Sequence, residues 1–302
     1  MAAHPHRLNL SAGLLSASVA LVLVLAKLWA LAATGALSVA ASLADSSLDL
    51  MVSLAGLAAI AYAARPPDED HAFGHSSAED LAALGQSAFI MVSAGVIAWA
   101  AIARLWAGPP SPIMAEGQGI AVMTLSIVLT LGLVLWQRRV IRATGNKVVA
   151  ADSLHYMGDL IPNIGAILSL WASAWFRLGQ IDSIVALGAA GVLAVGALRI
   201  GKGAWDALMD RGADPEMIAG IGRIADGFPG VRGHHDLKTR QAGSKVFVNL
   251  HIELDGAQSL NDAHAIGAAL RRAIIATYPQ ADVIIHKDPV GVTPHPDDPR
   301  QP

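Results

Sequence analysis

Two aspartates, Asp45 and Asp49, stand four residues apart inside an otherwise apolar stretch that is long enough to cross a membrane. On a helix, residues four apart share one face, so the two carboxylates point in the same direction. Carboxylates inside a membrane are costly unless a positive group lies between them. The spacing therefore predicts that a cation binds at this pair.

A second polar pair, His155 and Asp159, has the same spacing in a later apolar stretch. Three carboxylates and one imidazole suit a four-coordinate divalent cation such as zinc, cadmium, iron(II) or manganese. The three anionic ligands exceed the charge of such an ion by one, and an imidazole titrates near neutral pH, so we expect protons to compete with the metal. Asp152 is interpreted as lying nearer the water and is left out of the site.

A single buried Asp or His is often a hydrogen-bonded packing residue. Two pairs of metal-ligand type on separate apolar stretches favour a functional site instead, because ionisable groups inside a membrane usually serve function.

A third group lies in a polar loop, where Asp68, His71 and His75 could close around a cation. The alternative is a solvated acidic loop near the lipid headgroups.

Near the C-terminus, four histidines have Asp236 and Asp288 nearby in the sequence and are typical of one or two metals: His235, His251, His264 and His286. Taken singly, each of these histidines could equally be an uncoordinated surface residue.

The composition indicates the elements that must position these groups. The chain has 302 residues, of which 54% are hydrophobic and only 15% charged, and its mean hydropathy is +0.48. A soluble domain is about a quarter charged, so a membrane protein is expected. The net charge of -3 favours no nucleic-acid partner. Six stretches are predicted to span the bilayer: Leu10–Ala33, Leu37–Ala64, Leu81–Ala107, Gly119–Gln137, Val148–Phe176 and Ile181–Trp205.

The positions of the basic residues predict the orientation of the spans. One side of the membrane would carry most of them: Arg7, Arg65, Arg138, Arg139, Arg142, Lys147, Lys202 and Arg211. Positive residues gather on the cytoplasmic side, so both termini are expected in the cytoplasm. Lys27, inside the first span, is expected to extend toward the outer end of that span.

Residues 211–290 have the composition of a soluble domain, which follows the transmembrane domain at 1–210. Asp214 is a predicted N-cap, Lys245–Leu254 alternates as a half-buried strand does, and Leu260–Tyr278 is amphipathic. The predicted order α-β-β-α-β is a small α+β domain, which completes the predicted fold: a membrane all-α six-helix domain with a cytoplasmic α+β domain. The tail at 291–302, rich in Pro and Asp, is expected to be disordered.

The sequence lacks the motifs of several classes of enzyme and of ATP-driven pumps. The sequence contains no His-Glu-x-x-His, no Gly-x-Ser-x-Gly and no Walker-type phosphate loop. No enzyme activity is therefore expected, and any transport would have to use an ion gradient. The absence of cysteine excludes thiolate ligands and argues against copper(I).

The membrane pairs, the Phe73-Gly74-His75 loop, the segment Phe228–Val231 and the closing segment Val283–Pro289 resemble the cation diffusion facilitator family of bacterial zinc and ferrous-iron efflux proteins. The resemblance implies a homodimer that exchanges cytoplasmic divalent cations for protons by alternating access, and a metallochaperone-like cytoplasmic domain. It also implies three sites: a transport site, a loop site and a binuclear cytoplasmic site. Their ligands would be Asp45, Asp49, His155 and Asp159 for transport, Asp68, His71 and His75 in the loop, and His235, His251, His264, His286 and Asp288 in the cytoplasmic domain.

Two positions depart from the family pattern. Ser77 stands where relatives carry a lysine that pairs with an aspartate matching Asp210 to lock the dimer, and Lys287 replaces a glutamine beside the cytoplasmic site. Strand alternation is expected to point Lys287 away from His286 and Asp288.

The sequence as a whole predicts a proton-coupled exporter of zinc-like divalent cations. An iron(II) or manganese exporter on the same scaffold is the first alternative, since ligand type does not settle selectivity. A membrane metal sensor that does not transport is the second, although ligands inside the membrane favour transport.

Overall fold

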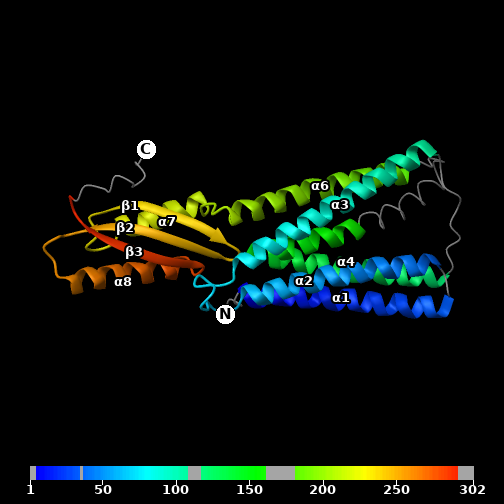
Figure 1. Ribbon diagram of the computed structural model, residues 1–302, viewed down its shortest axis with the longest axis horizontal. Coiled ribbons are helices and arrows are strands. Elements are labelled where there is room, and N and C mark those ends of the chain that lie inside the picture. Colours follow the sequence, from blue (N-terminus) through cyan, green and yellow to red (C-terminus); the bar gives the residue numbers. More distant parts are fainter. Residues whose placement is uncertain (1–4, 35–36, 108–116, 161–180, 292–302) are drawn as a thin grey trace. The chain divides into compact units, whose positions relative to one another are not determined.

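The computed structural model describes residues 5–34, 37–107, 117–160 and 181–291 (Figure 1). The chain divides into two compact units, Met1–Trp205 and Asp206–Pro302. The tail at 291–302, apart from Gly291, lies outside the described residues.

The first unit is built from long helices. Its helices are α1 (Pro5–Thr34), α2 (Leu37–Ala63), α3 (Ser77–Ala107), α4 (Gly117–Thr144), a helical segment at 147–160, and α6 (Ile181–Leu208). Among the described residues, five helices are long and apolar enough to cross a membrane: Pro5–Ala32, Asp45–Ala63, Ser77–Trp106, Thr124–Thr144 and Ser183–Leu208. The predicted fifth span, Val148–Phe176, lies partly outside the described residues. A helix satisfies its own backbone hydrogen bonds, which lipid cannot do.

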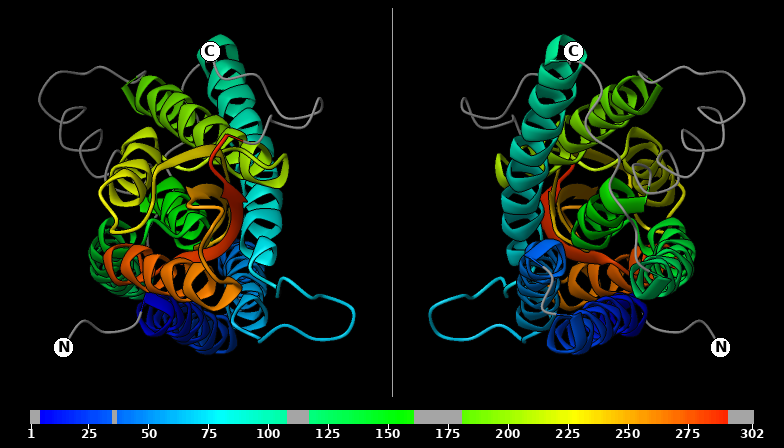
Figure 2. Two further views of the ribbon diagram at one scale, coloured as in Figure 1. Left: turned by 90° about the vertical axis from the view of Figure 1, so that its left-hand side faces the viewer. Right: turned by 90° about the vertical axis from the view of Figure 1, so that its right-hand side faces the viewer.

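Large apolar side chains face outward from this unit, as expected for contact with lipid. Trp99 is 75% exposed and Trp106 is 85% exposed. The views in Figure 2, along the helices, show α1 and α2 side by side. Gly13 of α1 permits this approach, because a Cβ there would lie 3.1 Å from Leu57 Cδ1.

Two small residues also bring the segment at 147–160 against α6. A Cβ at Gly196 would lie 2.7 Å from Leu154 Cδ2, and one at Gly158 would lie 3.2 Å from Leu193 Cδ1. Leu154 thus fills the space above Gly196, and this packing fixes the rotation of the helix that carries His155 and Asp159.

The second unit contains α7 (Pro215–Asp226), β1 (Gly233–Ala242), β2 (Lys245–Leu254), α8 (Leu260–Thr277) and β3 (Ala281–Pro289). The sheet order is β1-β2-β3, with β1 antiparallel and β3 parallel to β2. The carboxylate of Asp214 accepts a hydrogen bond from the Glu216 N–H and caps α7, as expected. The predicted fold class, a helical membrane domain with a small α+β domain, is confirmed.

The two helices of this unit cover one face of its sheet. The alternate residues Val248, Leu250 and Ile252 of β2 form a core with Leu270 and Ile274 of α8 and with α7. The remaining residues of β2, including His251, therefore lie on the opposite face. On this open face β2 carries Phe247 and the polar residues Asn249, His251 and Glu253.

Candidate metal centres

The two membrane pairs meet between α2 and the helical segment at 147–160. Asp49 Oδ1 lies 2.9 Å from His155 Nε2, and both side chains are nearly buried, with 10% and 12% of their surface exposed. Asp159 joins them, so that one ligand atom from each residue lies within 4.8 Å of the others. Two carboxylates and an imidazole at such distances could hold a divalent cation.

These residues line a cavity of about 290 Å³. Its other walls come from α3 and α6, including Phe89, Ser93 and Leu193. Asp45 also lines the cavity, but it is exposed and is not part of the close group. The structure thus brings together three of the four predicted ligands and places the fourth on the same cavity.

Lys27 lies beside this group. Its Nζ donates a 2.5 Å hydrogen bond to Ser46 Oγ on α2. The ammonium is close enough to act electrostatically on Asp45 and Asp159. A fixed positive charge therefore offsets one of the three carboxylates.

Asp152 also differs from expectation. It is only 5% exposed and accepts a 2.7 Å hydrogen bond from Gln137 Nε2. Ser53 Oγ lies 3.4 Å from its other oxygen and also bonds the Tyr156 hydroxyl. The interpretation that Asp152 lies nearer the water is wrong, because its carboxylate is buried and contacts polar groups on two neighbouring helices, α2 and α4.

The loop group is assembled by local hydrogen bonds. Asp68 Oδ1 accepts a 2.7 Å bond from the His71 backbone N–H, and Asp68 Oδ2 lies 3.1 Å from His75 Nε2. The backbone N–H of His71 holds the pKa of Asp68 below its usual value. Ligand atoms of all three predicted residues lie within 4.8 Å of one another. This arrangement suits a cation, and Asp68 remains ionised near neutral pH.

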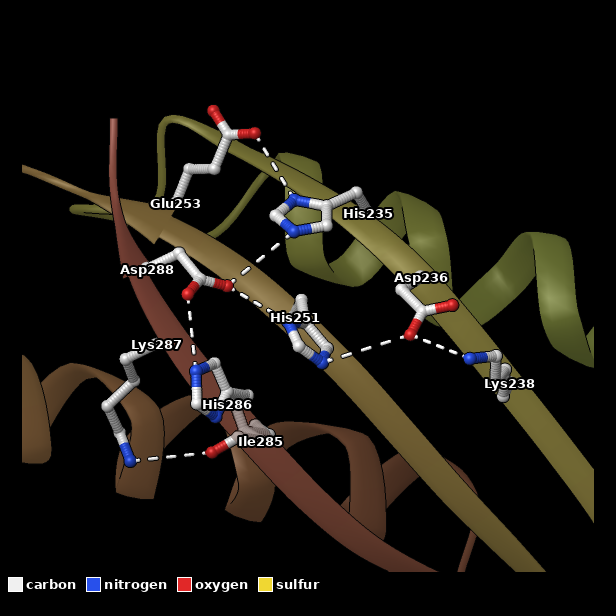
Figure 3. Close-up of polar contacts among 9 residues, drawn as sticks. All are labelled: His235, Asp236, Lys238, His251, Glu253, Ile285, His286, Lys287 and Asp288. Atoms are coloured by element: carbon white, nitrogen blue, oxygen red, sulfur yellow. Dashed lines mark hydrogen bonds and ion pairs between the residues drawn. The ribbon is translucent and has the colours of Figure 1, made fainter. Parts of the chain in front are cut away.

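The cytoplasmic group is a row across the sheet. His235, His251 and His286 are paired neighbours on β1, β2 and β3. Asp288 joins them, because its Oδ2 lies 2.9 Å from His251 Nδ1 and 3.5 Å from His235 Nε2, and its Oδ1 lies 3.2 Å from His286 Nε2 (Figure 3). Three imidazoles around one carboxylate fit a borderline divalent cation such as zinc.

The fifth predicted cytoplasmic ligand, His264, does not join this row. It is exposed on α8, and α8 packs on the face of the sheet opposite the histidines. Lys287 also lies on the α8 side: a Cβ at Gly267 would meet its Cε, and its Nζ lies 3.5 Å from the Ile285 carbonyl oxygen (Figure 3). The charge of Lys287 therefore points away from the row, as alternation predicted.

Three contacts were not foreseen in the sequence. Glu253 Oε1 lies 3.3 Å from His235 Nδ1. Glu253 follows His251 by two residues on the same strand, so alternation could have indicated that both side chains share one face of the sheet. Asp210 Oδ1 lies 3.2 Å from Arg240 Nη1. The contact of Lys27 with Ser46 has no local sequence signal, because it joins two helices.

Comparisons with known proteins agree with this architecture. The family model for the cation efflux transmembrane domain matches residues 13–209, and the model for the cation efflux protein cytoplasmic domain matches residues 213–290. The chain is 40% identical over 288 residues to the cation-efflux pump FieF of Klebsiella pneumoniae and 41% identical to that of Cronobacter sakazakii, covering 95% of both chains in each case.

Among solved structures, the metal-bound C-terminal domain of the CzcD transporter from Thermotoga maritima is 31% identical. The match covers 26% of this chain and 93% of the CzcD domain, with a TM-score of 0.26. The two family models and the relatives together show that the chain belongs to the cation efflux family, as a multi-pass membrane transporter with a cytoplasmic dimerisation domain and not as an enzyme.

Proposed function

We propose that this protein is a proton-coupled antiporter that exports zinc-like divalent cations from the cytoplasm by alternating access. The observation that carries the proposal is the contact between Asp49 and His155 at the cavity inside the membrane. These groups bind either protons or a metal, so uptake of one favours release of the other.

In this proposal, Asp45, Asp49, His155 and Asp159 form the transport site. Metal reaches them from the cytoplasm and displaces protons from the imidazole and the carboxylates. Asp45, on the wall of the cavity, completes the ligand set when the metal is held. Protons entering from the outside then displace the metal outward.

The two remaining groups bind cytoplasmic metal. Asp68, His71 and His75 form the loop site, and His235, His251, His286 and Asp288 form the cytoplasmic site. We further propose that the protein is a homodimer in the bacterial inner membrane, with both termini in the cytoplasm. The domain boundaries proposed from sequence, 1–210 and 211–290, keep the transport site and the cytoplasmic site in separate domains.

The proposal is tested by flux into vesicles that contain the purified protein and a zinc-sensitive dye. We expect an imposed pH gradient to drive zinc uptake and Asp49→Ala to abolish it. Asp282→Ala, which removes an exposed aspartate outside the three groups, is the matched control and should transport normally. Wild-type flux in Asp49→Ala would overturn the assigned site.

An iron(II) or manganese exporter is the second candidate. The specific observation is that carboxylates outnumber imidazoles at the cavity, which suits harder ions than zinc. Competition among zinc, cadmium, iron(II) and manganese in the same vesicles separates the two. A metal sensor would bind zinc but show no flux that depends on the pH gradient.

A further inference from the structure

Asp236 has a backbone conformation that side chains rarely adopt. Its φ is 48°, in the left-handed region. Residues other than glycine are uncommon there, and such conformations persist where the surrounding structure holds them, often at functional sites. Asp236 sits at an irregularity in β1, where the pairing shifts between His235 and Lys238.

The irregularity changes which side chains reach the open face of the sheet. In a regular strand, neighbours such as His235 and Asp236 would point to opposite faces. A bulge places an extra residue on one strand and re-aims its side chain. Here both neighbours approach His251: its ring lies 5.2 Å from that of His235, and its Nε2 lies 3.9 Å from Asp236 Oδ2 (Figure 3).

The two nitrogens of His251 consequently face different carboxylates. Nδ1 points to Asp288 Oδ2, where Nε2 of His235 also converges, and Nε2 points to Asp236. A histidine that binds a metal commonly donates its other N–H to a carboxylate, which fixes the tautomer and the orientation of the ring. The separation of 3.9 Å is longer than a hydrogen bond, so a hydrogen bond requires His251 and Asp236 to move closer together.

An ion pair with Lys238 does not account for this placement. Lys238 Nζ lies 2.9 Å from Asp236 Oδ2, but the Lys238 side chain is 58% exposed, and exposed ion pairs stabilise little. Asp236 is only 11% exposed, and its Oδ1 is buried without a hydrogen-bond partner among the described residues. A strained, buried carboxylate needs a stronger reason than a surface pair.

We propose that Asp236 is a positioning residue for the cytoplasmic metal group: its carboxylate accepts the Nε2–H of His251 and holds Nδ1 toward the metal. The inference rests on the proposed function, since it assumes that this group binds metal. It adds a residue that does not itself contact the ion, and it explains why β1 bulges at Asp236.

The test uses the full-length chain in detergent, with His75→Ala and His155→Ala as the background so that zinc binds chiefly to the cytoplasmic group. Zinc affinity is measured by competition with a fluorescent chelator. We expect Asp236→Gly to weaken binding by about 10–100-fold, the usual loss when the carboxylate behind a metal-binding histidine is removed. Asp236→Asn, which retains a weaker acceptor, should fall between.

Glycine also separates positioning from folding, because it adopts a positive φ without strain. The metal-free Asp236→Gly chain should therefore melt no lower than the background. The visible bands of bound cobalt(II) should shift in this variant, because the ring that ligates the ion is no longer held. Lys238→Met is the matched control and should change zinc affinity by less than about fivefold, the ceiling for an exposed ion pair.

Three outcomes would overturn the proposal: unchanged affinity in Asp236→Gly, a joint fall in affinity and melting temperature, or an equal loss of affinity in Lys238→Met. If the background chain itself binds no zinc, the cytoplasmic metal site of the proposed function fails instead. Zinc binding by the background chain is therefore measured before any Asp236 variant.

Discussion

His155 and Asp49 are 106 residues apart in the sequence, yet His155 Nε2 and Asp49 Oδ1 lie 2.9 Å apart inside the membrane unit. The contact joins two helices that each carry a costly polar pair, and it turns two local patterns into one candidate site.

We expect His155→Gln and Asp49→Asn each to weaken zinc binding at the membrane site by more than about tenfold, because even the groups behind metal ligands are worth about 10–100-fold. The double variant should lose less than the sum of the two, since the residues act on one ion. Zinc titration in a His75→Ala, His251→Ala background measures this. Fully additive losses would contradict a shared site.

Lys27→Met should tighten zinc binding and slow zinc release. The ammonium offsets one carboxylate. Two unit charges separated by roughly 10 Å interact by about 1–2 kcal/mol at an effective dielectric constant of about 20, which sets the expected change at roughly tenfold in affinity. Zinc affinity is best compared at alkaline pH, where protons compete least. Lys27→Arg retains the charge and should behave as wild type, and Ser46→Ala, which removes only the hydrogen-bond acceptor, should have a smaller effect. Weaker binding in Lys27→Met would contradict the charge balance.

Asp152→Ala should destabilise the membrane unit by about 1–3 kcal/mol, because it leaves the buried Gln137 Nε2 without its acceptor. The melting temperature in detergent reports this change. Asp152→Asn keeps an acceptor oxygen for Gln137 Nε2 and should be less affected. Equal melting temperatures for Asp152→Ala and wild type would mean that the network contributes no stability.

Acidification from pH 7 to pH 6 should leave Asp68 ionised, so that its carboxylate continues to support metal binding at the loop. The pKa of Asp68 is lowered by the His71 backbone N–H, so its contribution to loop order is complete above the ordinary aspartate pKa. That contribution is lost only as the pH falls through the lowered value. Asp68→Asn should therefore weaken zinc binding at the loop by a similar factor at pH 7 and at pH 6, because the carboxylate that it removes is ionised at both. A loss that disappears at pH 6, measured by zinc competition in a His155→Ala, His251→Ala background, would contradict this.

His286→Ala should weaken cytoplasmic zinc binding more than His264→Ala. His286 Nε2 contacts Asp288 directly, whereas His264 is exposed on the other side of the sheet. The two substitutions are chemically identical, so each is the control for the other. Equal losses of zinc affinity in the two variants at low protein concentration would mean that His264 contributes to the metal site in a way that the single chain does not show.

The sequence by itself determined the elements and their chemistry. The long apolar stretches, the spacing of Asp45 and Asp49, the N-cap Asp214 and the alternation of Lys245–Leu254 are all set by residues close together in the chain. Helical and strand periodicity act over a few residues, so such patterns can be recognised without a fold.

Only the tertiary structure decided which of these groups meet. Helix packing buried Asp152, directed Lys27 to Ser46 and left Asp45 on the cavity wall, and strand register aligned His235 with His251 and His286 while leaving His264 outside. Each of these outcomes depends on the rotation of a helix or on the pairing of strands far apart in the sequence. A single bulge at Asp236 changes which face a side chain occupies, and no local periodicity records it.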